Sequence, residues 1–179
     1  MVTIASSTGR KKNRNGVMSF TKWKQEAVEK LLSDEKLMKL LYYEESDCLE
    51  KPNLSEEQKE SLVHSQIYTY RYVEELSQNK RSYISMGMSN FVPQESFRHF
   101  SDDYLQGYIY FYILVDRSII QTDTGCRNDL ILSRVYELFQ EKRMFGMGEL
   151  RMEACVELWE QQSGYGGYTV GFRIVDFKW

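Results

Sequence analysis

Cysteine, histidine and proline are scarce in this chain, and the first two scarcities each exclude a class of protein. The three cysteines among the 179 residues stand far apart, at Cys48, Cys126 and Cys155, and form no CxxC pair. Such a set is not a disulfide framework, so we expect a protein of a reducing compartment. No cysteine lies at metal-ligand spacing from either of the two histidines, and no zinc site is predicted.

Long apolar runs are absent as well. The longest apolar and aromatic stretch, Tyr108 to Val115, is far too short to span a bilayer. The first residues contain no apolar core of the signal-peptide kind. The sequence therefore predicts neither secretion nor membrane insertion, and no membrane partner.

Sequence signatures of enzymes are also missing. The chain has no Walker A motif, no GxGxxG after a strand, no GxSxG and no HExxH. The glycines of Gly164 to Gly167 fall in an expected hairpin rather than at a helix N-terminus, so they are not predicted to cradle a phosphate. We therefore predict that the protein is not an enzyme and has no cofactor, metal or catalytic residue.

The net charge of −3 conceals an uneven distribution. Residues 1–16 carry Arg10, Lys11, Lys12 and Arg14 and no acid, so this segment is +4 and the remainder is −7. The segment is rich in Ser, Thr, Asn and Gly, a composition typical of disorder. We predict a flexible basic arm at 1–16 and a single domain at 17–179. A basic arm on an acidic body can bind nucleic acid or an acidic neighbour.

Helices are predicted in three places. Apolar residues at helical spacing favour one kinked or two consecutive helices over 20–43, with Ser33 as an N-cap between them. The pattern S-x-x-Q at Ser55 predicts a short helix over 56–63. A further helix is expected over 127–142, ended by Gly146 and Gly148.

Strands are predicted from the 13 tyrosines and other β-formers. Residues 67–73, 81–92 and 104–115 read as strands, the last being central because both of its faces are apolar or aromatic. A hairpin is expected over 149–177, where apolar residues alternate on both sides of a glycine-rich loop. The fold class is thus α+β, with an antiparallel sheet of about four to five strands packed against two main helices and an N-terminal helical segment.

The strict alternation of the first hairpin strand predicts which face is buried. Leu150, Met152, Ala154, Val156 and Leu158 should pack against the 127–142 helix. The acids Glu149, Glu153 and Glu157 would then share the opposite face. Charge reversal at Glu153 and Glu157 should impair assembly more than folding.

The element order and three short stretches carry a resemblance. The stretches are Leu40 to Tyr43, Lys51 to Lys59, and Gly171 to Phe177. With them the chain resembles the neck and tail-terminator proteins of tailed bacteriophages, which complete the tail and join it to the head.

The resemblance implies a structural virion protein that forms a homo-oligomeric ring, a hexamer by analogy with the family. Its partners would be further copies of itself, tail-tube and head-connector proteins, and DNA passing through the lumen without sequence-specific binding. It would act at the head–tail junction of the virion, and in the host cytoplasm during assembly. Whether it is a terminator, an adaptor or a stopper stays open.

Two other interpretations remain. The basic arm and the tyrosine-rich strand could form a nucleic-acid-binding or regulatory module, and scattered acids such as Asp102 and Glu153 could serve a metal-dependent nuclease. Under the ring hypothesis, the interface should combine charged and aromatic residues of the arm, the central strand and the hairpin. The candidate interface residues are Arg10, Lys11, Lys12, Arg14, Tyr108, Tyr110, Tyr112, Arg151, Glu153, Glu157, Trp159, Arg173 and Trp179.

Overall fold

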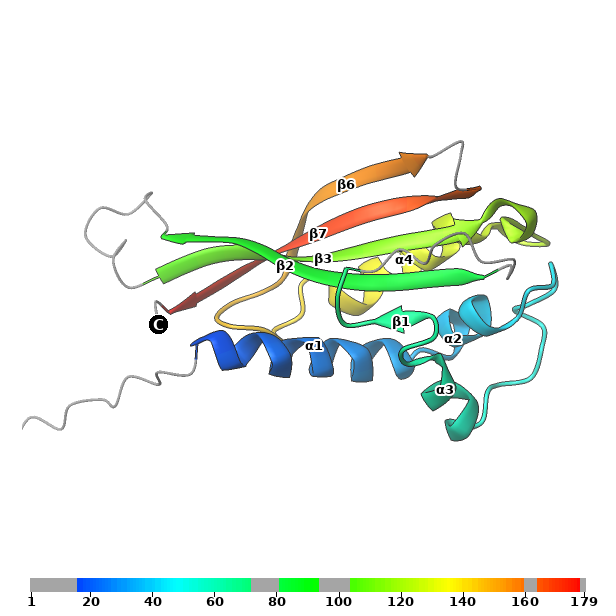
Figure 1. The fold of residues 1–179 in the computed structure, drawn as a ribbon, viewed down its shortest axis with the longest axis horizontal. Coiled ribbons are helices and arrows are strands. Elements are labelled where there is room, and N and C mark those ends of the chain that lie inside the picture. Colours follow the sequence, from blue (N-terminus) through cyan, green and yellow to red (C-terminus); the bar gives the residue numbers. More distant parts are fainter. Residues whose placement is uncertain (1–15, 72–80, 94–103, 160–163, 178–179) are drawn as a thin grey trace, which may run out of the picture.

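The computed structural model describes residues 16–71, 81–93, 104–159 and 164–177 as two layers, a twisted sheet and a layer of helices (Figure 1). The five strands of the sheet lie in the order β1-β2-β3-β7-β6. β1 is parallel to β2, and the other neighbours are antiparallel. The strand bounds are β1 Ile67–Tyr68, β2 Ser82–Pro93, β3 Tyr104–Asp116, β6 Arg151–Trp159 and β7 Tyr165–Phe177.

The helices are α1 Gly16–Leu32, α2 Glu35–Tyr42, α3 Glu56–Leu62 and α4 Arg127–Phe139. A 3-10 turn, Arg117–Ile119, and a small hairpin of β4 Gln121–Thr122 and β5 Gly125–Cys126 connect β3 to α4. The α+β prediction is confirmed, with one difference: the sheet is mixed, because β1 joins it in parallel.

The core lies between the helices and one face of the sheet. Burial alternates strictly along β3, where Ile109, Phe111 and Ile113 are fully buried on the helix side. The ring of Phe111 packs at 4.6 Å from that of Phe139 on α4. Alternation of this kind is typical of a sheet with one face on the core.

Several predicted bounds changed. The helical segment over 20–43 is two helices, but α1 begins at Gly16, and Asp34 rather than Ser33 is the N-cap of α2, accepting a hydrogen bond from the Leu37 amide at 2.7 Å. Ser33 instead donates to the carbonyl of Lys30. An aspartate carboxylate is the stronger acceptor at a helix N-terminus, because the helix dipole favours its charge.

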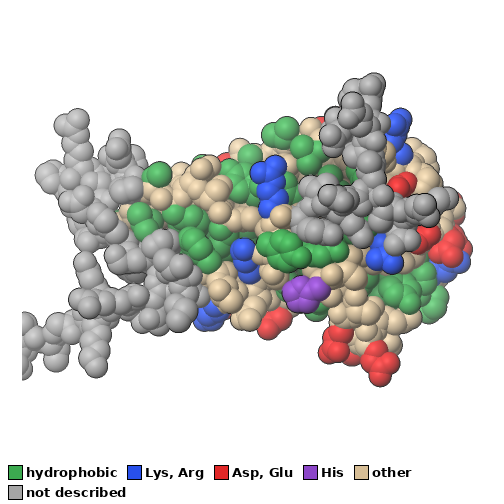
Figure 2. Space-filling view, viewed as in Figure 1, with side chains coloured by type: hydrophobic (Ala, Val, Ile, Leu, Met, Phe, Trp, Pro, Cys, Tyr) green, Lys and Arg blue, Asp and Glu red, His purple; other side chains and the backbone are tan. Residues whose placement is uncertain are grey.

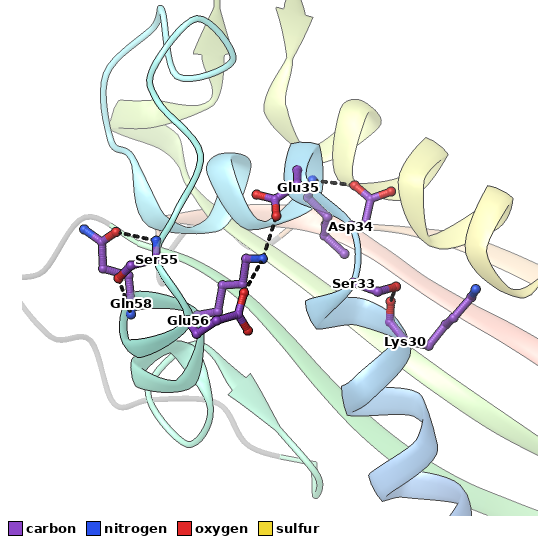
Figure 3. A network of polar contacts seen from close by, with 9 residues as sticks. Lys30, Ser33, Asp34, Glu35, Ser55, Glu56 and Gln58 are labelled. Carbon is purple, nitrogen blue, oxygen red and sulfur yellow. Dashed lines mark hydrogen bonds and ion pairs between the residues drawn. The ribbon is translucent and has the colours of Figure 1, made fainter.

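The junction of the first three helices is held by polar contacts (Figure 3). α3 has the predicted capping box, with reciprocal hydrogen bonds between Ser55 and Gln58. The ammonium of Lys59 bridges Glu35 on α2 and Glu56 on α3, at 2.5 and 3.0 Å. α3 is thereby fixed to the beginning of α2, at the C-terminal end of α1.

Two other predicted elements, a helix and a strand, are shorter in the structure. α4 ends at Phe139 with Gln140 as its C-cap, so Gly146 and Gly148 lie in the following loop and do not end the helix. Of the strand predicted over 67–73, only Ile67–Tyr68 pairs in the sheet, and 72–73 lie outside the described residues. Both sequence patterns continue past the point at which the backbone hydrogen bonds change partners.

Candidate interaction surface

The open face of the sheet lies opposite the helices, and a column of tyrosines runs along it. Tyr108, Tyr110 and Tyr112 alternate with the buried core residues of β3 and are half-buried. Among the described residues, no helix packs on this side of β3. Figure 2 shows hydrophobic side chains along the strands in view, with acidic side chains gathered at the end that carries α2 and α3.

Glycines beside this column let the tyrosine rings lie flat on the sheet. A Cβ added to Gly171 would meet the Tyr110 ring at 2.8 Å, and one added to Gly87 would meet the Tyr112 ring at 3.4 Å. The two rings therefore occupy the space in which neighbouring strands would carry side chains. The result is a smooth aromatic surface instead of a ridged one.

The rings also contact one another. Tyr108 and Tyr110 have centroids 5.8 Å apart, and Tyr110 and Tyr112 have centroids 6.3 Å apart at an interplanar angle of 28°. The guanidinium carbon of Arg71 lies 5.2 Å from the centroid of the Tyr112 ring. The surface thus already accepts one planar cation, within the range of a cation–π contact.

A small polar cluster lies at one end of the tyrosine column. Glu153 on β6 pairs with the Arg173 guanidinium on β7 at 3.0 Å and accepts a hydrogen bond from the Tyr108 hydroxyl at 2.9 Å. This hydrogen bond to a carboxylate raises the pKa of Tyr108. The cluster joins three neighbouring strands on the open face and brings together three of the candidate interface residues.

A β-bulge in β6 corrects the predicted burial of that strand. Met152 is opposite Phe172, but Ala154 is opposite Gly171, so Glu153 is the extra residue. A one-residue bulge exchanges the faces of every residue that follows it. Leu150 and Met152 do face the helices as predicted, whereas Ala154, Val156 and Leu158 share the open face with the tyrosines. This part of the prediction was wrong.

The same bulge separates the glutamates that were expected to share a surface. Glu157 is opposite Tyr168 and lies on the helix side of the sheet, away from Glu153. On that side the Tyr168 hydroxyl donates to Asp129 on α4 at 2.7 Å, which together with burial raises the pKa of Tyr168 to about 12. Glu157 is exposed and belongs to the rim of the helix layer rather than to the open face.

β6 forms one edge of the sheet. Val156 is 57% exposed there, and Cys155 is also exposed. Gln140, the C-cap of α4, covers the start of this edge by accepting the Met152 amide at 2.9 Å. Beyond Met152, the only strand that pairs with β6 in the described part of the chain is β7.

Arg127 is a buried residue that the sequence analysis missed. It is 0% exposed, and its guanidinium donates to five backbone carbonyls, one from Ile119 and four from the end of α2 and the loop after it. The carbonyls of the second group belong to Leu40, Tyr43, Glu44 and Glu45. Burial lowers the pKa of this guanidinium. A cation at the first position of a helix opposes the helix dipole, and this misfit was the available signal.

The remaining candidate interface residues fall into two groups. Arg151 is exposed near the polar cluster, with a weak ion pair to Glu149 at 4.0 Å. The arm residues Arg10, Lys11, Lys12 and Arg14, together with Trp179, lie outside the described residues. Trp159 is the last residue of β6, and its side chain is not described.

The described residues contain neither a candidate metal-binding cluster nor a candidate membrane-spanning helix. No group of three or more His, Cys, Asp or Glu side chains is placed to hold a metal ion there. Within the same ranges, no helix is both long and apolar enough to cross a membrane.

These features define a two-layer α+β protein with helices on one face of its sheet and a flat aromatic surface on the other. The chain belongs to the YomW family, whose model matches residues 34–174, from the N-cap of α2 into β7. YomW is a phage-derived protein family, associated with SPbeta-like prophages of Bacillus. No curated protein matches the chain.

Proposed function

We propose that this protein is a structural component of the phage neck, which terminates the tail tube and joins the tail to the head as a homo-oligomeric ring. The observation that supports this most is the open face, an aromatic sheet surface presented by a member of a phage-derived family. Tyrosine is enriched at protein interfaces, because its ring gives apolar contact area and its hydroxyl tolerates partial hydration.

A ring requires two different contact surfaces on each subunit, since only heterologous contacts close around an axis of higher than twofold symmetry. The open face, the β6 edge and the acidic end at α2 and α3 are three chemically distinct surfaces on one domain. The resemblance to tail terminators implies six subunits. The ring would contact the tail tube and the head connector in the virion, after assembly in the host cytoplasm.

The charge of the body is compatible with DNA passing through such a ring. The segment from Glu44 to Glu60 holds seven acids and two lysines. Both lysines are already engaged, Lys51 with Asp47 and Lys59 with Glu35 and Glu56. A surface of this sign repels phosphate and would let DNA slide without binding.

A nucleic-acid-binding module is the second candidate, and one contact favours it. Stacked aromatic rings with arginines beside them are typical of surfaces that bind single strands, and the Arg71 guanidinium already lies over the Tyr112 ring. The Glu153 carboxylate among the arginines weakens this interpretation. Single-strand binding that falls steeply with salt and survives deletion of residues 1–16 would support it.

The test compares Tyr110→Asp with Tyr136→Asp. Tyr110 lies in the centre of the open face, whereas Tyr136 is a 41% exposed tyrosine on α4. Because a central aromatic residue carries much of the energy of an interface, we expect Tyr110→Asp to weaken assembly more than about tenfold. Tyr136→Asp should assemble like the wild type. Light scattering after size exclusion and negative-stain images measure the outcome.

Circular dichroism should show that both variants keep the fold. A wild-type chain that stays monomeric under all conditions, forms no ring and binds no tails would contradict the proposed function. Rings formed equally by both variants would exclude the open face as the contact.

A further inference from the structure

The two edges of the sheet have complementary shapes and directions. One edge is β6, which is paired only with β7 among the described residues. The other edge is β2 beyond Ser85, because β1 covers β2 only at Ile84 and Ser85. Within the described chain, Met86–Ser89 pair in the sheet only with β3. The described part of the molecule therefore presents two strand edges without a second partner strand, on opposite sides of one sheet.

Strand direction makes these edges compatible between copies. β2, β3, β7 and β6 are successively antiparallel, so β6 runs opposite to β2. If the second copy is related to the first by rotation about an axis parallel to the strands, the β2 strands of the two copies run in the same direction. Its β2 would then lie antiparallel to β6 of the first copy, and the alternation of the sheet would continue across the contact.

The side chains of the two edges are also compatible in size when β6 and β2 lie side by side. On the open face, the β2 residues beyond Ser85 that lie opposite the tyrosine column are Gly87 and Ser89, both small. On the same face of β6 lie Ala154 and the 57% exposed Val156. An apolar branched side chain at one edge thus faces a row without bulky side chains at the other.

The β6 edge also has few of the features that keep strand edges from pairing. Such edges are usually short, lysine-bearing, proline-bearing or bulged along their length. The nine residues of β6 contain neither lysine nor proline, and the bulge and the Gln140 contact lie only at its start.

We infer that β6 of one copy pairs antiparallel with β2 of the next copy, around Met86–Ser89, so that main-chain hydrogen bonds join the subunits into one continuous sheet. This inference rests on the proposed ring and adds to its open-face contact a strand pairing between the two edges that border that face. Addition of a strand to an exposed edge gives affinity through the backbone and specificity through alternate side chains. Contact between opposite edges is heterologous, as a closed ring requires.

Cross-linking tests the contact in the full chain. In a Cys126→Ser, Cys155→Ser background, the remaining cysteine, Cys48, is buried. Adding Val156→Cys on β6 and Ser89→Cys on β2 places two exposed thiols on the open face of the sheet. A short bismaleimide should then give a covalent ladder on a denaturing gel that extends beyond dimers to the full ring.

The two single-thiol parents are the matched controls for this experiment. In the same background, Val156→Cys alone or Ser89→Cys alone should give no ladder, since each edge meets the other edge and not itself. Rings seen in the microscope without a ladder in the double-thiol variant would overturn the inference and leave the proposed function standing. A dimer cross-linked in the variant that carries Val156→Cys alone would also overturn it.

Substitution at the edge gives an independent readout. Val156→Lys puts a charge where the neighbouring strand should lie, and we expect the assembly constant to fall at least about tenfold. Tyr136→Lys adds the same charge at an exposed apolar position on α4 and should assemble normally. Equal assembly by the two variants would overturn the edge contact. A wild-type chain that never forms rings would overturn both this contact and the proposed function.

Discussion

Arg127 shows how much a single residue can organise in this protein. Its guanidinium is fully buried, and the hydrogen bonds described give it no direct carboxylate partner. Five backbone carbonyls accept hydrogen bonds from it instead. Four of these carbonyls lie at the C-terminal end of α2 and just after it, where the helix dipole is negative and the last carbonyls lack intrahelical partners. One side chain therefore joins the beginning of α4 to the end of α2.

Arg127→Met should destabilise the fold by at least about 3 kcal/mol, because several buried carbonyls would lose a charged donor. Urea unfolding followed by circular dichroism measures the free energy of unfolding. Arg117→Met is the matched control, since Arg117 is exposed on the 3-10 turn, and it should change stability by less than about 0.5 kcal/mol. Equal losses in the two variants would contradict the structural role of Arg127.

At the scale of the element, β7 depends on a close approach to β3. A Cβ at Gly167 would lie 1.9 Å from the carbonyl oxygen of Ile113, a backbone atom that cannot move without breaking the β3–β7 pairing. At the neighbouring Gly166, the nearest atom to an added Cβ is 3.8 Å away. The glycine-rich loop predicted over 161–167 thus includes three residues of the strand itself, Tyr165, Gly166 and Gly167.

Gly167→Ala should therefore cost about 3 kcal/mol or more, as overpacking against a fixed backbone does. Gly166→Ala, one position away in the same strand, should stay within about 1 kcal/mol of the wild type. Thermal and urea unfolding of the two variants give the comparison. Similar stabilities for both would mean that β3 and β7 separate more easily than their continuous pairing implies.

At the scale of the whole molecule, two glutamates with similar surface ion pairs should differ in their effect on assembly. Glu153→Lys breaks a surface ion pair with Arg173 on the open face, and Glu137→Lys breaks a surface ion pair with Arg134 on α4. Each change should cost the monomer no more than about 1 kcal/mol, because exposed pairs contribute little. Only Glu153→Lys should reduce ring formation in light scattering.

Glu157 allows the same comparison for the helix side of the sheet. The alternation of the sequence grouped it with Glu153, and the bulge moves it to the helix side. If the open face is the assembly surface, Glu157→Lys should affect assembly less than Glu153→Lys. The reverse order would place the contact on the rim of the helix layer.

The sequence by itself determined the elements whose signals are local. The alternation of β3, the capping box of α3 and the apolar rows of α4 follow from nearest-neighbour chemistry, so they could be read directly, to within a few residues at their ends. The grouping of the tyrosines on one face followed from the same two-residue period. For the same reason, Tyr108, Tyr110 and Tyr112 could be named together as candidate interface residues.

Only the tertiary structure decided the features that depend on contacts between distant segments. The bulge at Glu153 leaves no trace in a strict alternation, yet it exchanges Ala154 and Val156 with Glu157 between the two faces. The burial of Arg127 requires α2 and α4 to meet, and the flattened tyrosines require glycines from two neighbouring strands. Register and burial arise from packing across the sheet, which no local pattern records.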